Sequence, residues 1–182
     1  MSQRTLQHPR SVNPHAADPI ASAVASVRRL VRVLRLHAQR TQAVAGVSAA
    51  QLFVLQQLRT DDSLSLNELA ARTFTDRSSV ADVVDRLQAQ GWVDRATDPA
   101  DRRRASVRIT TAGRRVLSRA PDAPTTALIT ALRALSLSER KSLAKSLERL
   151  NQALGAAAGP APMLFAEPDE TQKHRRKIGR SR

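Results

Sequence analysis

A short stretch of the sequence places arginine and small polar side chains where a helix is expected to begin. Asp76 is followed by Arg77, Ser78 and Ser79, and Asp82 comes about one turn later. Arg can donate a forked pair of hydrogen bonds to a guanine edge, Ser can bond to bases or phosphates, and Asp can accept from a cytosine amino group. The positive end of a helix also favours phosphate. These residues therefore predict contacts with nucleic acid.

A second basic cluster follows, made of Arg102, Arg103 and Arg104. The segments on either side, 92–95 and 105–109, alternate apolar and polar residues, and Asp-Pro-Ala-Asp at 98–101 favours a turn. The pattern predicts a β-hairpin with arginines at its tip, where they are available to enter a narrow minor groove. The alternative is a solvated charge run that contacts nothing. Asp101 is placed to pair with Arg95 or Arg103 and stabilise the tip.

The elements that position these clusters are mostly helical. An apolar stripe with helical spacing predicts a first helix over about 20–43 and contains Ile20, Val24, Val27, Val31, Leu34 and Ala38. Three capping boxes predict later helix starts, at Ser48 with Gln51, Ser65 with Glu68 and Ser136 with Glu139. Asp76 is expected to cap the helix that Gly91 ends, and Thr110 the helix after the hairpin.

Composition excludes several classes of protein. The 182 residues carry 30 Lys and Arg against 16 Asp and Glu, a net charge of +14, which favours a polyanionic partner. Without cysteine, the chain has no disulfide framework, thiol nucleophile or zinc finger. No nucleophile–base pair, glycine-rich phosphate loop or metal cluster is recognisable, so we expect no enzyme activity, no cofactor and no metal.

The element order defines the expected fold. We predict a mainly α protein with a small β-hairpin wing, namely a winged helix-turn-helix at about 48–113 within a domain at 20–154. Long helices at both ends indicate dimerisation, because their apolar stripes exceed what one small core can bury. Residues 1–19 are expected to be a disordered arm and 155–182 a flexible basic tail. Without an apolar run of 18 residues or a signal peptide, we expect a cytoplasmic, nucleoid-associated protein with no membrane role.

These features together resemble the MarR (multiple-antibiotic-resistance regulator) family of transcriptional regulators. The matching motifs are Glu68-Leu69-Ala70, Asp76-Arg77-Ser78-Ser79-Val80, Val84-Asp85-Arg86-Leu87, Gly91-Trp92-Val93, Arg95, Asp98-Pro99, Asp101-Arg102-Arg103 and Val107 to Gly113. They run from the helix-turn-helix through the wing to the next helix.

The resemblance implies a homodimer on double-stranded DNA at a pseudo-palindromic operator, usually as a repressor. The dimerisation helices would lie at about 20–43 and 125–154, and a recognition helix at about 77–90, which includes Arg86, would enter the major groove. Arg103 matches the family's minor-groove arginine, and Asp101 matches its structural partner. Many members release DNA when a small anionic or phenolic ligand binds between the dimer helices and the DNA-binding lobe.

Several points remain open in the sequence. Arg32 and His37 are weak candidates for a ligand site, and a lone His on a helix is more often an ordinary surface or core residue. Phe74 occupies a turn position where many helix-turn-helix proteins have Gly, and prolines at 121 and 124 interrupt a helix that is commonly continuous in the family. The competing function is an architectural or weakly specific nucleic-acid-binding protein driven by net charge and the basic tail. That function predicts steep salt dependence with little sequence preference.

Overall fold

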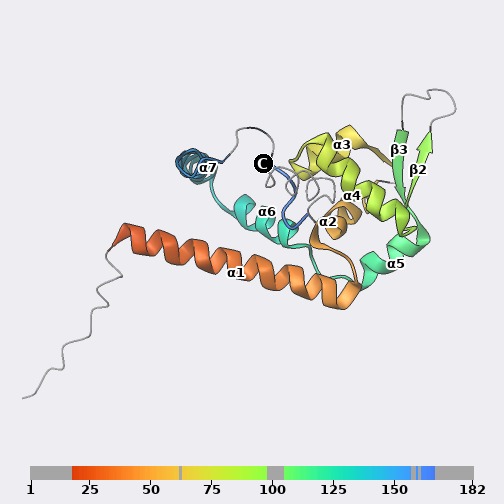
Figure 1. Cartoon of the computed structure of the whole chain (residues 1–182), viewed down its shortest axis with the longest axis horizontal. Coiled ribbons are helices and arrows are strands. Elements are labelled where there is room, and N and C mark those ends of the chain that lie inside the picture. Colours follow the sequence, from red (N-terminus) through yellow and green to blue (C-terminus); the bar gives the residue numbers. More distant parts are fainter. Residues whose placement is uncertain (1–17, 62, 98–104, 157–158, 160, 167–182) are drawn as a thin grey trace, which may run out of the picture.

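A computed structural model of the chain describes residues 18–61, 63–97, 105–156, 159 and 161–166. Figure 1 shows a compact lobe that carries a β-hairpin, with one long helix beneath it and another helix standing apart. In chain order the elements are α1 (Pro19–Ala45), α2 (Ala49–Gln57), β1 (Leu64–Ser65), α3 (Leu66–Thr73), α4 (Arg77–Ala89), β2 (Val93–Thr97), β3 (Ala105–Ile109), α5 (Thr111–Arg119), α6 (Pro124–Ala134) and α7 (Leu137–Ala153).

The predicted helix caps are confirmed. Ser48, Ser65 and Ser136 each accept a hydrogen bond from the backbone three residues on, and the Gln or Glu there bonds back, so all three capping boxes are complete. Asp76 caps α4 and Thr110 caps α5. These contacts satisfy backbone N–H groups that a helix start leaves without partners, which is why local sequence predicts them.

The core of the lobe lies where α2, α3, α4 and the hairpin meet. α2 is buried over most of its length, since seven of its residues from Ala49 to Leu55 are inaccessible or nearly so. The side chains that pack around it with at most 1% exposure include Leu69, Val80, Val84, Leu87, Val93 and Val107. This packing fixes the angle between α3 and α4 and attaches the hairpin to both.

The sheet has three antiparallel strands in the order β1-β3-β2. The β2–β3 register pairs Val93 with Ile109 and Asp94 with Arg108, as expected for the predicted hairpin. β1 adds a third strand, with Leu64 opposite Val107. We did not predict β1, because two residues are too few to show an alternating pattern.

Two helices leave their apolar faces uncovered. On α1, Ile20 is 74% exposed, and Val24, Val27 and Val31 are between 39% and 48% exposed. On α7, Leu143, Leu147 and Leu150 are exposed and no residue is buried. Within the described part of the chain, nothing covers the α7 stripe or the first part of the α1 stripe, whereas Leu34 further along α1 is buried.

The ends of the chain differ from their expected organisation in one place. The predicted arm at 1–19 and the basic end of the predicted tail fall almost entirely outside the described residues. Residues 161–166, expected to be flexible, instead pack against the lobe, and Met163 is only 7% exposed. In the described residues no helix combines the length and the hydropathy needed to span a bilayer.

Candidate nucleic-acid interface

The helix-turn-helix is formed by α3 and α4. Phe74 ends α3 in the left-handed region, with φ of 54°, and Thr75 N donates to Ala70 O at 3.1 Å. A non-glycine residue seldom adopts this conformation. The Phe74 side chain is 71% exposed, so the turn accommodates it without burying the ring in the core. The missing Gly at this position therefore does not prevent the tight turn.

The residues that begin α4 form a compact polar cluster. Ser78 Oγ donates to Asp76 Oδ1 at 2.5 Å, and Ser79 donates through Oγ to Oδ2 at 2.7 Å and through N to Oδ1 at 2.8 Å. The hydrogen bond from Ser78, with those from Ser79, holds the pKa of Asp76 well below its ordinary value. While these bonds persist, both hydroxyl hydrogens are directed to Asp76, so toward a ligand each hydroxyl can only accept a hydrogen bond. This suits base amino groups, which donate, better than phosphate oxygens, which accept.

The outer face of α4 presents several of the predicted DNA contacts. Arg77, Ser78 and Asp82 are exposed, and Ser79 is half-buried. The buried side chains of α4 are Val80, Val83, Val84 and Leu87. At about 100° per residue, Ser78 and Asp82 lie opposite them, whereas Arg77, at the first position of the helix, lies toward their edge. The core thus holds the outer face toward solvent, as a recognition helix requires.

Arg86 has a different location from the other predicted contacts. It is half-buried and lies beside Gln42, Gly46 and Gln51, near the junction of α1 and α2. Arg86 lies one turn beyond Asp82 on the same side of α4, toward the end of the helix. A contact from Arg86 to DNA stays a prediction, and its position favours the edge of the interface.

The hairpin is attached to α4 by an ion pair. Side chains alternate along a strand, so Arg95 shares the inward face of β2 with the buried Val93. Arg95 Nη2 lies 2.5 Å from Asp85 Oδ1 on α4. Arg95 was predicted to stabilise the wing, and the structure gives it a partner on the recognition helix. Asp101 and the tip arginines Arg102, Arg103 and Arg104 lie outside the described residues.

The base of the hairpin is fixed by the start of α5. Thr110 N donates to Trp92 O at 3.0 Å, and Thr110 Oγ1 donates to Gly91 O at 2.8 Å. Gly113, buried in the first turn of α5, packs against the same carbonyl, since a Cβ there would lie 2.1 Å from Trp92 O. The spacing of Thr110 and Gly113 therefore positions α5 directly on the hairpin base. Sequence reasoning identified the Thr cap but missed the role of Gly113.

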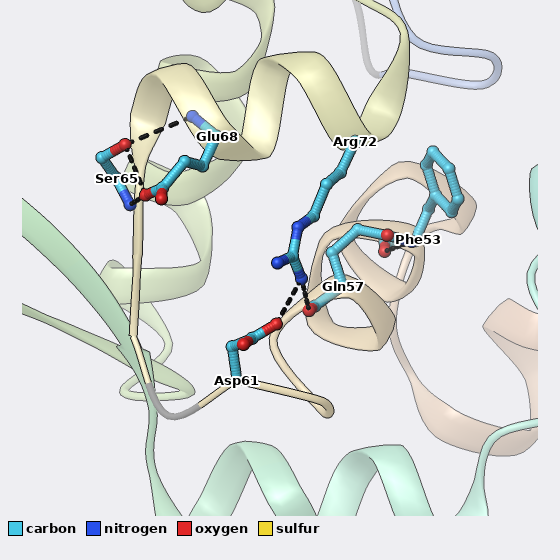
Figure 2. A network of polar contacts seen from close by, with 6 residues as sticks. All are labelled: Phe53, Gln57, Asp61, Ser65, Glu68 and Arg72. Atoms are coloured by element: carbon cyan, nitrogen blue, oxygen red, sulfur yellow. Dashed lines mark hydrogen bonds and ion pairs between the residues drawn. The ribbon is translucent and has the colours of Figure 1, made fainter.

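A second polar network holds α3 against α2 (Figure 2). Arg72 Nη1 donates to Asp61 Oδ2 at 2.5 Å and to Gln57 O at 3.5 Å. Ser65 and Glu68 form the capping box at the other end of α3. Both ends of α3 are thus fixed, and α3 in turn supports α4.

A cavity of about 480 Å³ lies between the lobe and α6. Its walls are mostly apolar and include Phe53 of α2, Ile129 of α6 and Met163, with Arg133 and Arg140 among the lining residues. The weak ligand candidates Arg32 and His37 do not line it. Among the described residues, no three His, Asp or Glu side chains gather as metal ligands.

Comparisons with known proteins agree with this geometry. A sequence profile of the MarR family matches residues 45–104, the segment that holds α2 to α4 and the first strand of the hairpin, β2. The HTH-type transcriptional regulator TtmR of Methylorubrum extorquens (strain PA1) is 29% identical over 166 residues, which cover 91% of this chain and 80% of TtmR. Sco3205, a MarR family transcriptional regulator from Streptomyces coelicolor solved in complex with DNA, has a TM-score of 0.52 and 26% identity, over 75% of this chain and 92% of Sco3205.

The segment 45–104 of the chain, which contains the helix-turn-helix, matches the MarR family. The chain is a DNA-binding transcriptional regulator with the winged-helix architecture predicted from its sequence. The HTH-type transcriptional repressor MdtR of Bacillus subtilis (strain 168) is also similar, at 30% identity over 54% of this chain and 64% of MdtR.

One feature of this regulator, the segment 161–166 that forms part of the cavity wall, lies outside the profile match. A sequence signal for the segment exists in Met163, Leu164 and Phe165, an apolar cluster within a stretch otherwise rich in Ala, Gly and Pro. We assigned that stretch to the flexible tail from its composition.

Proposed function

We propose that this regulator is a homodimeric repressor that binds a pseudo-palindromic operator and releases it when a small amphipathic anion binds. The observation that carries the dimer is the pair of uncovered apolar stripes on α1 and α7. Solvent-exposed side chains with i, i+3, i+4 spacing on two long helices are unfavourable in a monomer and are typical of an interface.

A dimer presents two copies of the α4 outer face. Symmetric helix-turn-helix dimers bind half-sites one DNA turn apart, about 34–36 Å. In the proposed complex Arg77 donates to a guanine edge, the hydroxyls of Ser78 and Ser79 accept from base amino groups, and Asp82 accepts from cytosine. The tip arginines 102–104, with Arg103 foremost, enter the minor groove on each side.

The cavity beside α6 is the proposed effector site. Its volume falls in the range usual for small-molecule sites, about 300–1,000 Å³. Its apolar walls suit an aromatic or aliphatic body, and Arg133 and Arg140 supply positive charge for a carboxylate or phenolate. A ligand there contacts both the lobe and α6, so it can alter the distance between the two recognition helices.

The experiment that tests the operator is selection of a DNA sequence by the purified protein, followed by titration of that sequence and of random DNA at several salt concentrations. Arg77→Ala is expected to cost about 1–3 kcal/mol on the selected site and to relax its base preference. Arg103→Ala is expected to weaken binding as well. Arg149→Ala removes the same charge from α7, off its apolar stripe, and serves as the control. Equal affinity for selected and random DNA at every salt concentration refutes the proposal.

The alternative is an architectural nucleic-acid-binding protein, which the net charge of +14 favours. Truncation after residue 166 separates the two functions, because it removes basic residues without touching the lobe. Loss of most binding supports the alternative, whereas retained specific binding supports the regulator. We place the protein in the cytoplasm with the nucleoid and assign it no catalytic role, because its described polar clusters serve as helix caps and ion pairs.

The dimer and the effector have their own measurements. Light scattering is expected to give twice the chain mass, and Leu147→Glu, at the middle of the α7 stripe, is expected to reduce it to one chain mass. The apolar anion 8-anilinonaphthalene-1-sulfonate is a suitable probe of the cavity. Its affinity is expected to fall several-fold in the double variant Arg133→Gln with Arg140→Gln, and an unchanged affinity places the effector elsewhere.

A further inference from the structure

The segment 161–166, which we call the C-terminal strap, returns from the end of α7 to the lobe (Figure 1). Met163 enters the core cluster and is 7% exposed, and Ala166 packs against the same cluster. Ala166 N donates to Met163 O at 3.1 Å, which closes a tight turn. The strap therefore docks through one buried side chain and not through extensive secondary structure.

The strap also contacts the turn before the recognition helix. Thr75 Oγ1 donates to Ala161 O at 2.8 Å. Thr75 lies between Phe74, which ends α3, and Asp76, which caps α4. A change in strap position thus acts on the residue between the two helices of the helix-turn-helix.

The strap forms one wall of the cavity. Ala161, Pro162, Met163 and Leu164 line it, with Ile129 and Leu132 of α6 also among the lining residues. Removing the strap would open the cavity to solvent along that wall. A molecule bound in the cavity consequently loses apolar contacts whenever the strap undocks.

From these contacts we infer that the strap completes the effector site and that ligand binding and strap docking stabilise each other. This inference rests on the proposed function for the identity of the cavity as an effector site. The coupling is reciprocal. If undocking of the strap lowers the affinity for the ligand by a given factor, then bound ligand must favour the docked strap by the same factor. Through Ala161 and Thr75, the state of the cavity is then transmitted to the start of α4.

The test exploits the absence of cysteine from the chain. Met163→Cys introduces a single thiol at the buried position of the strap, and Leu164→Cys introduces one at its 40% exposed neighbour. Docking is expected to slow the reaction of Met163→Cys with a thiol reagent several-fold relative to Leu164→Cys, because Cys is a small hydrophobe that keeps part of the buried contact of Met163. Equal rates would overturn the inference.

The coupling is measured with 8-anilinonaphthalene-1-sulfonate as the cavity probe. A saturating concentration is expected to slow the reaction of Met163→Cys further while leaving Leu164→Cys unchanged. Truncation after residue 156 removes the strap and is expected to lower the affinity for the probe by about the factor by which the probe slows the thiol reaction. Truncation after residue 166 keeps the strap and is the matched control. A probe that binds the shorter chain with full affinity, or that leaves the thiol rate unchanged, overturns the coupling.

The link to α4 is tested separately. In the Met163→Cys background, Thr75→Val removes the hydrogen bond to Ala161 and is expected to raise the thiol rate about fivefold, the effect of one net hydrogen bond. An unchanged rate shows that Thr75 does not hold the strap. Circular-dichroism melts of each variant verify folding. None of these measurements uses DNA, so failure of the strap inference and failure of the operator proposal are distinguishable.

Discussion

Gly113→Ala is the substitution that best tests how the wing is fixed to the lobe. The added Cβ would lie 2.1 Å from Trp92 O and 2.9 Å from Ile109 Cγ1, and the first of these atoms belongs to the backbone. Neither distance is compatible with van der Waals radii. The start of α5 must therefore move away from the hairpin base, and the hydrogen bond from Thr110 N to Trp92 O, at 3.0 Å, is lengthened or lost.

The magnitude follows from three contributions. Overpacking costs about 1–3 kcal/mol. Loss of the Thr110–Trp92 hydrogen bond adds about 1 kcal/mol. The higher helix propensity of Ala returns up to about 1 kcal/mol. The net expectation is a decrease of about 2 kcal/mol in the free energy of unfolding, or about 4–8 °C in Tm for a chain of this length.

The assay combines thermal denaturation with the fluorescence of Trp92, the single tryptophan, which lies at the perturbed contact. Protein concentrations must match, because the proposed dimerisation would make Tm depend on concentration. The control is Ala112→Ser, an exposed neighbour in the same helical turn. A Gly113→Ala protein with the wild-type Tm and an unchanged Trp92 emission spectrum would refute the close contact and its proposed role.

Three further outcomes are expected. A double-mutant cycle on Asp85 and Arg95 should give a coupling of about 0.2–1 kcal/mol that falls with added salt, because both side chains are partly exposed; zero coupling at low salt argues against the ion pair. Asp76→Ala should cost about 1 kcal/mol and Asp76→Asn less. Because the pKa of Asp76 is lower in the folded protein, ionised Asp76 stabilises the fold at pH values above its unfolded pKa near 3.9. In urea denaturation, the difference in free energy of unfolding between wild type and Asp76→Asn should therefore be constant near neutral pH and shrink as the pH falls below about 4. Thr41→Val should stabilise by about 1 kcal/mol in the same assay, because the buried Thr41 hydroxyl has no hydrogen-bond partner among the described residues; a less stable variant would show that the hydroxyl is satisfied.

The parts of the fold predicted from sequence depend on local contacts. The capping boxes at Ser48, Ser65 and Ser136 need residues only three apart, so each is visible in the sequence. The hairpin is visible because its two strands alternate and pair with each other. The break between α5 and α6 follows from proline, which stands at the first position of α6.

The parts that could not be predicted depend on contacts between distant segments. We expected Asp101 to pair with Arg95 or Arg103, and that pairing lies outside the described residues. The ion pair of Arg95 with Asp85, which belongs to another element, gave no signal in the sequence. Gly113 gave no sign of its role, because its close contact is with the backbone of Trp92 and not with a neighbour in sequence. The strap was missed because composition describes average behaviour, whereas one methionine is enough to dock a short segment.

The uncovered stripe on α7 and the docked strap are connected through the chain. α7 has no buried residue, so within one chain little fixes its position, and a partner helix on Leu143, Leu147 and Leu150 would supply what is missing. The strap follows α7 within a few residues and docks on the lobe through Met163. Fixing α7 in a dimer therefore restricts where the strap can reach and lowers the entropy cost of docking it. On this reasoning the cavity is most completely formed in the dimer, so effector affinity measured with 8-anilinonaphthalene-1-sulfonate should fall in Leu147→Glu even though Leu147 does not line the cavity.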